Sequence, residues 1–583
     1  MNSSTYSPKR TLWIACLAMV LGVVMAGIAQ FLLWLIEVIT SFAFFGRFGL
    51  AETPVGNELG WGVVLVPVIG GLIIGVMARY GSPAIRGHGI PEAMEQVLVN
   101  GSRIPARITW LKPLSAAISI GTGGPFGAEG PIIATGGASG SLIGQILPVS
   151  ASERKTLLAA GAAAGMAATF GSPLSALLLA VELLLFEFKT RSLIPVALAV
   201  SVAAVVRTAW MGPAPVFPMP ELAAPTIAAF AGCLLIAVIM GLAAFAMSRA
   251  VYWVEDGFEK LPIHWMWWPA LGAVAVGVIG YFEPRTLGVG YSNITTNLSG
   301  SDTVLAVGLL CGLKFVSWSL SLGSGTSGGT LAPLMTIGSG LGWILGVLFQ
   351  NWIPGLDPHL AALLGMACAF GGASQAMLAS AVFACETTGQ SAALFPLLAC
   401  CAVSVWVVRA LGKTSIMTEK IERRGVRVPS QYGVNVFEQT RVAAVMDTAP
   451  VTIPSSMPLA ELEKRVSCRD DELGRHQAHP ILDEHGELAG LITRGDLVRA
   501  IETAPAEARV LDCAATTLIC VTPDETVHEA LEKLLRHDIG RLPVVAPGNS
   551  KKLVGYLSRR AILSAHHRDF HEEARSPGWL AAK

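Results

Sequence analysis

A glycine-rich stretch that contains one carboxylate lies between two long apolar runs, at residues 121–131. It reads Gly-Thr-Gly-Gly-Pro-Phe-Gly-Ala-Glu-Gly-Pro, with the acid at Glu129 and a proline at Pro131. Glycines let backbone N–H groups converge on a small ligand, and a helix accepts proline in its first turn. The N-terminus of that helix carries partial positive charge, which suits an anion. The stretch therefore predicts an anion site at which Glu129 competes with a permeant ion. The alternative is a surface loop whose Glu caps a helix.

Composition places most of the chain in a lipid bilayer. Of the 583 residues, 52% are hydrophobic and only 14% are charged, and the mean hydropathy is +0.57. A soluble multidomain protein is less apolar than this. Residues 12–36 form an uncharged span long enough to cross a membrane. The formal net charge of zero argues against a nucleic-acid binder, and the ten scattered cysteines indicate buried apolar residues, neither a disulfide framework nor a zinc site.

Two further glycine-rich breaks interrupt the apolar segments that follow. One is Gly-His-Gly-Ile-Pro at 87–91, and the other runs from Gly323 through Gly-Gly-Thr-Leu-Ala-Pro at 328–333. Irregular backbone at membrane depth is tolerated only where it is buried in protein or lines a cavity. We therefore expect the three breaks to begin helices that share one site.

The two halves of the apolar region resemble each other in spacing. Glu182 follows Pro131, and Glu386 follows Pro333, at nearly the same separation, and each Glu ends an apolar run of similar composition. Transporters built from inverted repeats place their ion site between the repeats, on discontinuous helices. The spacing indicates such a repeat, with chance similarity as the alternative.

The three glycine-rich breaks resemble the signature loops of the CLC chloride channels and proton-coupled chloride transporters. Residues 87–91 resemble the family's GSGIP, residues 127–131 resemble G(R/K)EGP, and residues 329–333 resemble GxFxP. The resemblance covers about residues 10–425. It implies an α-helical polytopic membrane protein with an inverted repeat of discontinuous helices, assigned here to residues 1–425, and a homodimer with one pore in each subunit.

The same resemblance implies roles for individual residues. Glu129 would be the gating glutamate, and Lys112 the basic residue behind the pore. The residues expected to bind the anion are His88, Gly89, Ile90, Gly127, Gly130, Thr330, Leu331, Ile416 and Met417.

Four positions depart from the family pattern, and each bears on mechanism. His88 stands where the family usually has Ser, and Ala128 replaces the Arg or Lys beside the gating glutamate. Leu183, next to Glu182, occupies the position of the internal proton-relay glutamate of proton-coupled members. The anion-contacting Tyr has become Ile416, or Met417 if the alignment shifts by one residue. These changes predict channel-like or weakly proton-coupled transport of chloride or a similar small anion. The alternative is a chloride/proton antiporter with an atypical relay, in which Glu182 or water carries the proton.

A soluble α/β region follows a charged, polar linker at residues 426–440. Two similar units, 441–505 and 506–570, are each expected to contain a short first strand, a helix, two strands and a final helix, and residues 571–583 form a tail. The repeated pattern is expected to run from 445 to 501 and from 510 to 563, with a short strand first, the helices at 459–466 and 527–535, and the middle strands at 479–482 and 542–545. These units resemble a tandem pair of CBS domains, which we expect on the cytoplasmic side of an inner or plasma membrane.

CBS pairs frequently bind adenine nucleotides through a Gly-x-x-(Ser/Thr)-x-x-Asp signature. The first unit keeps the polar pair as Thr493 and Asp496, whereas the second has Ser558 but Ala561. Two interpretations remain. The pair has one nucleotide site, or it is a purely structural module in which Thr493 only caps a helix.

Rival functions lack their signatures. A membrane metalloprotease needs H-E-x-x-H, which this sequence does not contain, and a divalent-cation transporter needs several carboxylates at membrane depth. His566, His567 and His571 fit a solvated helix better than a metal site. The sequence therefore predicts a membrane anion transporter and not an enzyme, with no required cofactor, no metal and no nucleic-acid partner.

Overall fold

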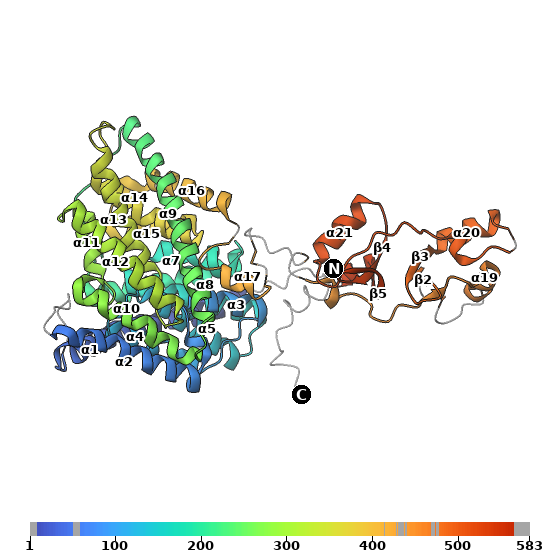
Figure 1. The fold of residues 1–583 in the computed structure, drawn as a ribbon, viewed down its shortest axis with the longest axis horizontal. Coiled ribbons are helices and arrows are strands. Elements are labelled where there is room, and N and C mark those ends of the chain that lie inside the picture. The colour runs from blue at the N-terminus through green and yellow to red at the C-terminus, as the bar shows by residue number, and fades with distance from the viewer. Residues whose placement is uncertain are drawn as a thin grey trace. The chain divides into compact units, whose positions relative to one another are not determined.

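Glycine and proline breaks divide the apolar part of the chain into helices of very unequal length (Figure 1). The computed structural model describes residues 8–49, 59–412, 414–426, 428–429, 437, 440–467, 473, 477–505 and 507–564. The chain forms two compact units, one within residues 1–432 and the other within 433–575. Each unit is described here by itself.

The first unit is helical. Its α-helices are α1 (Pro8–Phe45), α2 (Leu65–Val76), α3 (Ile90–Val99), α4 (Ile108–Gly121), α5 (Glu129–Ile146), α6 (Ala151–Phe170), α7 (Pro173–Leu179), α8 (Thr190–Met211), α9 (Ile227–Glu259), α10 (Trp268–Phe282), α11 (Tyr291–Ser299), α12 (Val304–Gly323), α13 (Leu331–Phe349), α14 (Pro358–Ser374), α15 (Met377–Thr388), α16 (Leu394–Leu411) and α17 (Glu419–Arg423). Shorter 3-10 or π turns are η1 (Gly60–Val64), η2 (Met77–Gly81), η3 (Pro83–Ile85), η4 (Ala180–Leu185), η5 (Trp265–Trp267), η6 (Pro284–Thr286) and η7 (Ser391–Ala393).

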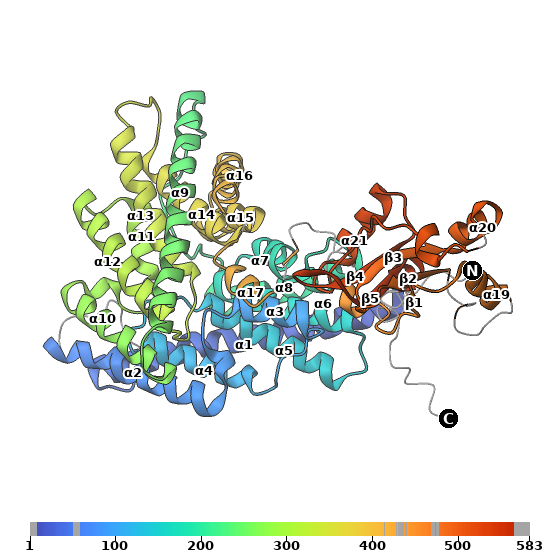
Figure 2. The same cartoon turned by 45° about the vertical axis from the view of Figure 1, so that its right-hand side comes forward.

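The helices α1–α8 and α9–α16 repeat one order of long and short elements, which confirms the predicted inverted repeat. A long helix opens each half, and a short helix that begins after a left-handed glycine follows (α3 after Gly89, φ 91°; α11 after Gly290, φ 69°). In the first half, α1 packs against α4, α6 and α8, and Figure 2 shows it beside α4 and α5 in the lower part of this unit.

The centre of the unit consists of two close helix pairs, α5 with α6 and α13 with α14. Small residues make the approach possible: a Cβ at Gly136 would lie 2.1 Å from the carbonyl oxygen of Gly161, and one at Gly338 would lie 2.5 Å from that of Gly365. Helix pairs in membranes depend on this kind of contact, since lipid provides no hydrophobic drive for association. The same device in both halves fixes the helices whose N-termini form the site.

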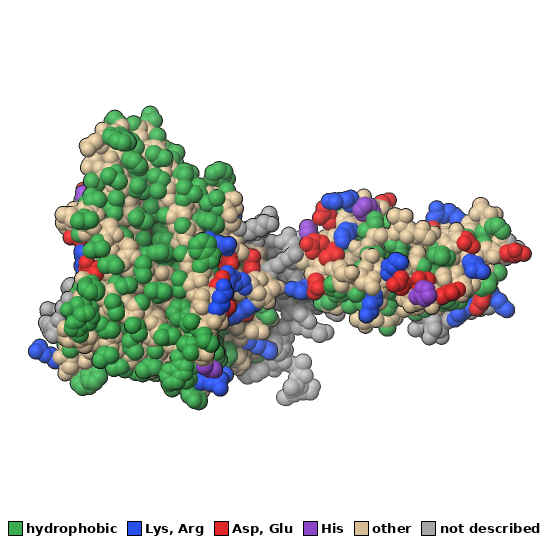
Figure 3. All heavy atoms as spheres, in the orientation of Figure 1, with side chains coloured by type: hydrophobic (Ala, Val, Ile, Leu, Met, Phe, Trp, Pro, Cys, Tyr) green, Lys and Arg blue, Asp and Glu red, His purple; other side chains and the backbone are tan. Residues whose placement is uncertain are grey.

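Eight helices among the described residues are long and apolar enough to cross a membrane: Lys9–Phe45, Gly60–Gly81, Thr190–Met211, Ile227–Glu259, Trp265–Phe282, Val304–Gly323, Leu331–Phe349 and Ser391–Leu411. The first contains the span predicted at 12–36. Apolar side chains cover most of the face of this unit that Figure 3 shows. Together these features confirm a multi-pass membrane protein.

The second unit is α/β. It contains η8 (Val442–Ala444), β1 (Ile453–Pro454), α19 (Leu459–Ser467), β2 (Ala478–Leu482), β3 (Leu488–Thr493), α20 (Arg494–Thr503), η9 (Val510–Cys513), α21 (Val527–Arg536), β4 (Arg541–Ala546) and β5 (Asn549–Ser558). One sheet has the order β1-β2-β3, with β1 parallel and β3 antiparallel to β2, and a second sheet pairs β4 with β5 in antiparallel fashion. The predicted helices and middle strands are present.

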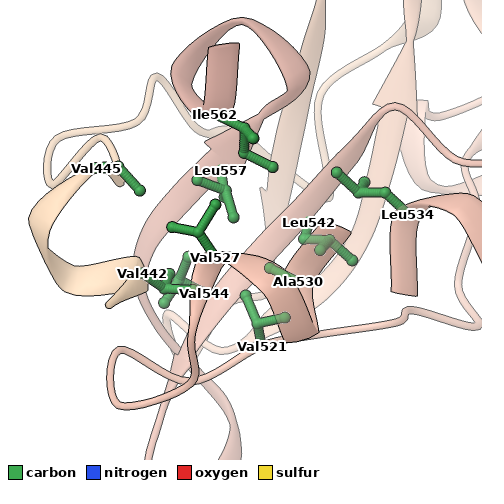
Figure 4. Packing of buried hydrophobic residues seen from close by; sticks show 10 residues of the cluster. All are labelled: Val442, Val445, Val521, Val527, Ala530, Leu534, Leu542, Val544, Leu557 and Ile562. Atoms are coloured by element: carbon green, nitrogen blue, oxygen red, sulfur yellow. The ribbon is translucent and has the colours of Figure 1, made fainter. Parts of the chain in front are cut away.

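The short strand predicted before the first helix is present as β1, whereas the described residues before α21 form only isolated bridges, such as that of residue 521 with 544. The two halves of this unit exchange their leading segments. Val442 and Val445 are buried with Val527 and Leu557, in the core of the second half (Figure 4). Val510 is buried in the core of the first half. Each segment forms a 3-10 turn (η8 or η9), and only isolated bridges, such as that of residue 447 with 556, join it to a sheet. Neither half therefore buries its apolar residues alone.

Candidate functional site

Three glycine-rich helix starts meet at one place in the first unit. The backbones of Gly127 and Gly329 exchange two hydrogen bonds, of 3.0 and 3.3 Å, in an antiparallel bridge. Gly87 pairs in parallel with Ser327. These bridges join the segments before α3, α5 and α13, so the N-termini of the three helices lie side by side.

Two glycines make this approach possible. A Cβ at Gly130 would lie 2.0 Å from the carbonyl oxygen of His88, and one at Gly89 would lie 2.6 Å from that of Gly130. Gly89 also has a φ of 91°, which L side chains rarely adopt. The structure therefore brings His88, Gly89, Gly127 and Gly130 together, as the sequence predicted, and the reason is steric.

Glu129 is the first residue of α5, and its side chain is fully buried among these helix starts. Its Oε1 accepts a hydrogen bond of 3.1 Å from the hydroxyl of Tyr291, at the start of α11. The backbone N–H groups of Glu129 itself and Ala332 lie close to the carboxylate, while Oε2 makes no hydrogen bond of good geometry. Within the described part of the chain, no ion pair reaches Glu129, so backbone dipoles and one phenol surround this carboxylate.

The segment that precedes α17 completes one side of the site. The Ile416 N–H donates to the carbonyl of Ala373 at 2.9 Å, and the Tyr252 hydroxyl donates to the Ile416 carbonyl at 2.8 Å. The buried His88 ring also hydrogen-bonds the Ile416 backbone. Ion pairs of Arg423 with Asp256 hold the following helix against α9.

Ile416, its neighbour Met417, Thr330 and Leu331 are all buried in this region. Thr330 is the N-cap residue of α13, and Leu331 is the first residue of that helix. Neither Thr330 Oγ1 nor His88 Nδ1 has a hydrogen-bond partner. Buried polar atoms normally have hydrogen-bond partners, so these two atoms are notable exceptions at the helix starts.

Lys112 lies behind the site, not in it. Its Nζ donates to the carbonyls of Ile85 and Gly87, both at 2.8 Å, and the side chain is buried. Lys112 therefore fixes the loop whose next residues are His88 and Gly89. Glu92 accepts from the Gly89 N–H at 2.7 Å and supplies a nearby negative charge.

The inverted repeat contains a counterpart of Lys112 that the sequence analysis missed. Lys314 on α12 donates to the carbonyls of Thr286 and Gly288, at 2.9 and 3.1 Å, in the loop before α11. The sequences 87–90 and 288–291, Gly-His-Gly-Ile and Gly-Val-Gly-Tyr, correspond. This correspondence is the sequence signal that could have identified Lys314. It also makes Tyr291 the counterpart of Ile90, which begins α3.

The proposed proton-relay position lies in η4. Leu183 is buried, and the carboxylate of Glu182 accepts from the N–H groups of Leu378 and Ala379, at 3.0 and 2.9 Å. Glu182 therefore caps the start of α15.

Glu386 mirrors this arrangement in the other repeat. Its carboxylate accepts from the N–H groups of Leu174 and Ser175 at the start of α7, at 3.0 and 2.8 Å. The two carboxylates cap helices in each other's halves, which gives both glutamates a structural task.

In the second unit, Thr493 and Asp496 form a capping box at the start of α20. Thr493 Oγ1 accepts from the Asp496 N–H, and Asp496 Oδ2 accepts from the N–H and hydroxyl of Thr493, at 2.9 and 2.7 Å. Arg499 pairs with Asp496 Oδ1 at 2.5 Å. Helix capping therefore already occupies both predicted nucleotide contacts.

A pocket of about 860 Å³ opens elsewhere in this unit. Arg541, Arg559, Arg560, Asp447 and Tyr556 contribute to its lining. Burial raises the pKa of Tyr556 to about 12, so its phenol is protonated at neutral pH. The described residues contain no cluster of His, Cys, Asp and Glu able to hold a metal ion. His566, His567 and His571 lie outside the described residues.

Comparisons with known proteins agree with this architecture. Residues 70–409 match the family model for voltage gated chloride channels, and residues 442–503 and 510–568 match that for CBS domains. Chloride channel protein CLC-f of Arabidopsis thaliana is 24% identical, over 87% of this chain and 73% of its own length. A putative ClcB-like chloride channel protein of Ralstonia nicotianae is 27% identical over 62% and 86%. The H(+)/Cl(-) exchange transporter ClcA of Vibrio parahaemolyticus is 27% identical over 59% and 75%.

Solved structures share the fold. A slow cyanobacterial Cl-/H+ antiporter superimposes with a TM-score of 0.64 and 22% identity, covering 72% of this chain and 98% of its own. A eukaryotic CLC transporter gives 0.62 and 20%, covering 95% and 99%. The family match over residues 70–409 agrees with the helix order and the glycine-rich helix starts. The chain therefore belongs to the voltage-gated chloride channel family, with a C-terminal pair of CBS domains.

Proposed function

We propose that this protein moves chloride or a similar small anion across a membrane, through the site formed by the starts of α3, α5 and α13, and that Glu129 is its gate. One observation carries the proposal. A fully buried carboxylate begins α5, at the meeting point of three helix N-termini, and no ion pair among the described residues neutralises it.

The electrostatics of the site favour an anion over a cation. Helix N-termini present partial positive charge and unpaired N–H donors. Lys112, buried behind the loop that leads into α3, adds a full positive charge. A divalent cation needs several converging carboxylates. Here Glu129 lies among the helix starts, and the other nearby acid, Glu92, caps the Gly89 N–H beside Lys112.

The gate works by competition. When Glu129 is ionised, its carboxylate takes the place of an anion beside the helix N-termini and blocks the path. When the carboxyl group is protonated, it loses that electrostatic advantage, and the anion replaces it. Acid protonates the carboxylate but leaves chloride charged. Acid should therefore increase chloride flux.

We further propose that transport is channel-like or weakly coupled to protons. Leu183 cannot carry a proton, and helix capping by Glu182 holds that carboxylate on the α15 N–H groups. A chloride/proton antiporter with an atypical relay is the alternative, since relatives named as channels and as exchangers both match this chain.

Three finer expectations complete the proposal. The CBS pair lies in the cytoplasm, the membrane is an inner or plasma membrane, and the protein is a homodimer, as the family resemblance implies. The pair modulates transport, with an adenine nucleotide at Thr493 and Asp496 as the proposed ligand and a purely structural module as the competing interpretation.

Glu129→Gln tests the gate. The neutral amide imitates the protonated acid, so chloride flux into proteoliposomes should lose most of its dependence on pH. Glu95→Gln is the matched control, because Glu95 forms an ion pair with Arg424 and should leave the pH profile unchanged. If Glu129→Gln titrates like the unchanged protein, Glu129 is not the gate.

A further inference from the structure

We infer that Tyr291 is a positioning residue for the gate: its hydroxyl holds the ionised carboxylate of Glu129 in the blocking position, and its ring separates that carboxylate from a neighbouring pocket. The inference rests on the proposed function, because it assigns Tyr291 a role at the same site. It concerns a residue in the opposite repeat, 162 positions along the chain from Glu129.

The hydrogen bond is specific. The Tyr291 hydroxyl donates to Oε1 of Glu129 at 3.1 Å, and among the described residues it is the one side chain that hydrogen-bonds this carboxylate. A phenol is a donor of fixed direction, so its contribution depends on where the ring is held. A hydrogen bond to a charged acceptor is stronger than one to a neutral acceptor. The phenol therefore favours the ionised, blocking carboxylate over the protonated one.

An aromatic cluster holds the ring in place. Phe170 and Phe217 meet Tyr291 edge-to-face, with ring centroids 5.7 and 5.8 Å away, and Phe383 packs on Phe170 at 5.2 Å. All three phenylalanines are buried. They come from the end of α6, the segment between α8 and α9, and α15. Four separate parts of the chain thus fix the position of a single hydroxyl group.

The other side of Tyr291 faces a pocket of about 180 Å³ between α1 and the loop that leads into α11. Gly123, Gly288, Gly290 and Asn293 also line it. Because Tyr291 touches both this pocket and Glu129, it lies where an anion would pass between the pocket and the gate.

The titratable groups around this arrangement are few. Glu37 and Arg285 line the pocket, and Arg285 is paired with Glu283 and Asp302 at 2.8 and 2.6 Å. Lys314 lies behind the loop before α11. At the start of α3 and behind its loop lie His88, Glu92 and Lys112. Within the described residues none of these forms an ion pair with Glu129, so the phenol is its direct side-chain partner.

Tyr291→Phe removes the hydroxyl and keeps the ring in the aromatic cluster. We expect the pH of half-maximal chloride flux to rise by about one unit, because the blocking carboxylate loses a donor. Flux near pH 7 should increase accordingly. Tyr281→Phe is the matched control: this tyrosine of α10 stacks on Trp61 at 4.2 Å and should leave the profile unchanged.

A second background isolates the contact. In Glu129→Ala, which has no carboxylate to hold, Tyr291→Phe should change neither the size of the flux nor its pH dependence. Thermal unfolding in detergent shows whether Tyr291→Phe still folds, and Tyr291→Leu, which removes the ring as well, should open the gate at least as far.

The outcomes separate the two proposals. If Glu129→Gln abolishes the pH dependence but folded Tyr291→Phe titrates like the unchanged protein, the tyrosine has no positioning role and the gate assignment stands. If Glu129→Gln itself titrates normally, the proposed function fails first. An equal effect of Tyr291→Phe with and without the Glu129 carboxylate would also overturn the inference, because the hydroxyl would then act through another group.

Discussion

His88 shows how one substitution in a signature loop changes the chemistry available at a site. A serine hydroxyl would donate to an anion, whereas the buried imidazole here hydrogen-bonds the backbone of Ile416 and leaves Nδ1 without a partner. Glu92 lies near the ring as well as Lys112 and Lys420, so its charged neighbours are of both signs. Because the buried ring already bonds the Ile416 backbone, we expect His88 to act as a structural group and not as a sensor of acid.

This assignment makes a prediction for His88→Ser. The midpoint of the pH profile of chloride flux between about pH 5 and 8 should be the same as in the unchanged protein, because an unperturbed histidine would titrate in that range. The size of the flux can change, since the serine hydroxyl is a new donor. Proteoliposome flux at closely spaced pH values measures both quantities, and a midpoint displaced by more than about half a pH unit would identify the histidine as a sensor.

At this scale the sequence predicted much of the site, because glycines at this spacing and an acid set among apolar segments strongly constrain the local backbone. Glu129, His88, Gly127 and Gly130 are where the sequence analysis expected them. Tyr291 was missed because its importance depends on a contact between repeats, and no local pattern marks it. Only the correspondence of residues 87–90 with 288–291 could have revealed it.

At the scale of elements, the reciprocal capping of α7 and α15 is the feature that ties the repeats together. Glu182 and Glu386 each accept two backbone N–H groups from the start of a helix in the other half. Such carboxylates also complement the positive end of the helix dipole. The sequence showed that both glutamates end similar apolar runs, but it could not show that each side chain serves the other repeat.

Glu386→Ala should destabilise the membrane unit by about 1–3 kcal/mol, because the N–H groups of Leu174 and Ser175 lose their acceptors. Glu386→Gln retains one acceptor oxygen and should cost less. Thermal unfolding in detergent, followed by tryptophan fluorescence, measures the unfolding midpoints of the unchanged protein, Glu386→Gln and Glu386→Ala. We expect these midpoints to fall in that order. Equal midpoints for all three proteins would show that water satisfies these groups as well.

A second element-scale prediction concerns α20. Asp496→Ala removes the capping box with Thr493 and should loosen the start of this helix by about 1 kcal/mol, whether or not nucleotide is present. Hydrogen exchange of the α20 amides in the full-length protein should accelerate several-fold. Asp496→Asn keeps an acceptor for the Thr493 N–H and should exchange more slowly than the Ala variant.

Calorimetry with ADP and ATP on the same proteins tests the proposed ligand. Weak binding at one site per subunit that disappears in Asp496→Ala would support the nucleotide site. No heat from any adenine nucleotide would leave the pair with a structural role, and unchanged binding in Asp496→Ala would move the ligand away from this residue, with the arginine-lined pocket at Arg541 and Arg559 as the place to examine next.

At the scale of the whole molecule, the link between anion movement and proton movement depends on a relay. Under the proposed function, strict exchange would require a proton to reach Glu129 through an ionisable residue. Leu183 is buried and apolar at the expected place, and the Glu182 carboxylate caps α15. At the proposed anion site, Ile416 offers no side-chain hydroxyl.

We therefore predict chloride movement down its gradient with little proton movement in return. Proteoliposomes loaded with chloride and placed in a chloride gradient, with external pH recorded, provide the measurement. Glu129→Gln serves as the control for any proton movement that does occur through the gate. Proton transport uphill, at a fixed ratio to chloride, would contradict the prediction and favour an antiporter with an atypical relay.

The exchange of leading segments within the CBS pair has a consequence for synthesis on the ribosome. Val442 and Val445 belong to a core whose other members, Val521 to Ile562, are translated roughly a hundred residues later. At about 5–20 residues per second, these valines remain without their partners for roughly 5–20 seconds. A nascent chain that stops between the two halves therefore exposes Val442 and Val445 and leaves the core of the first half without Val510.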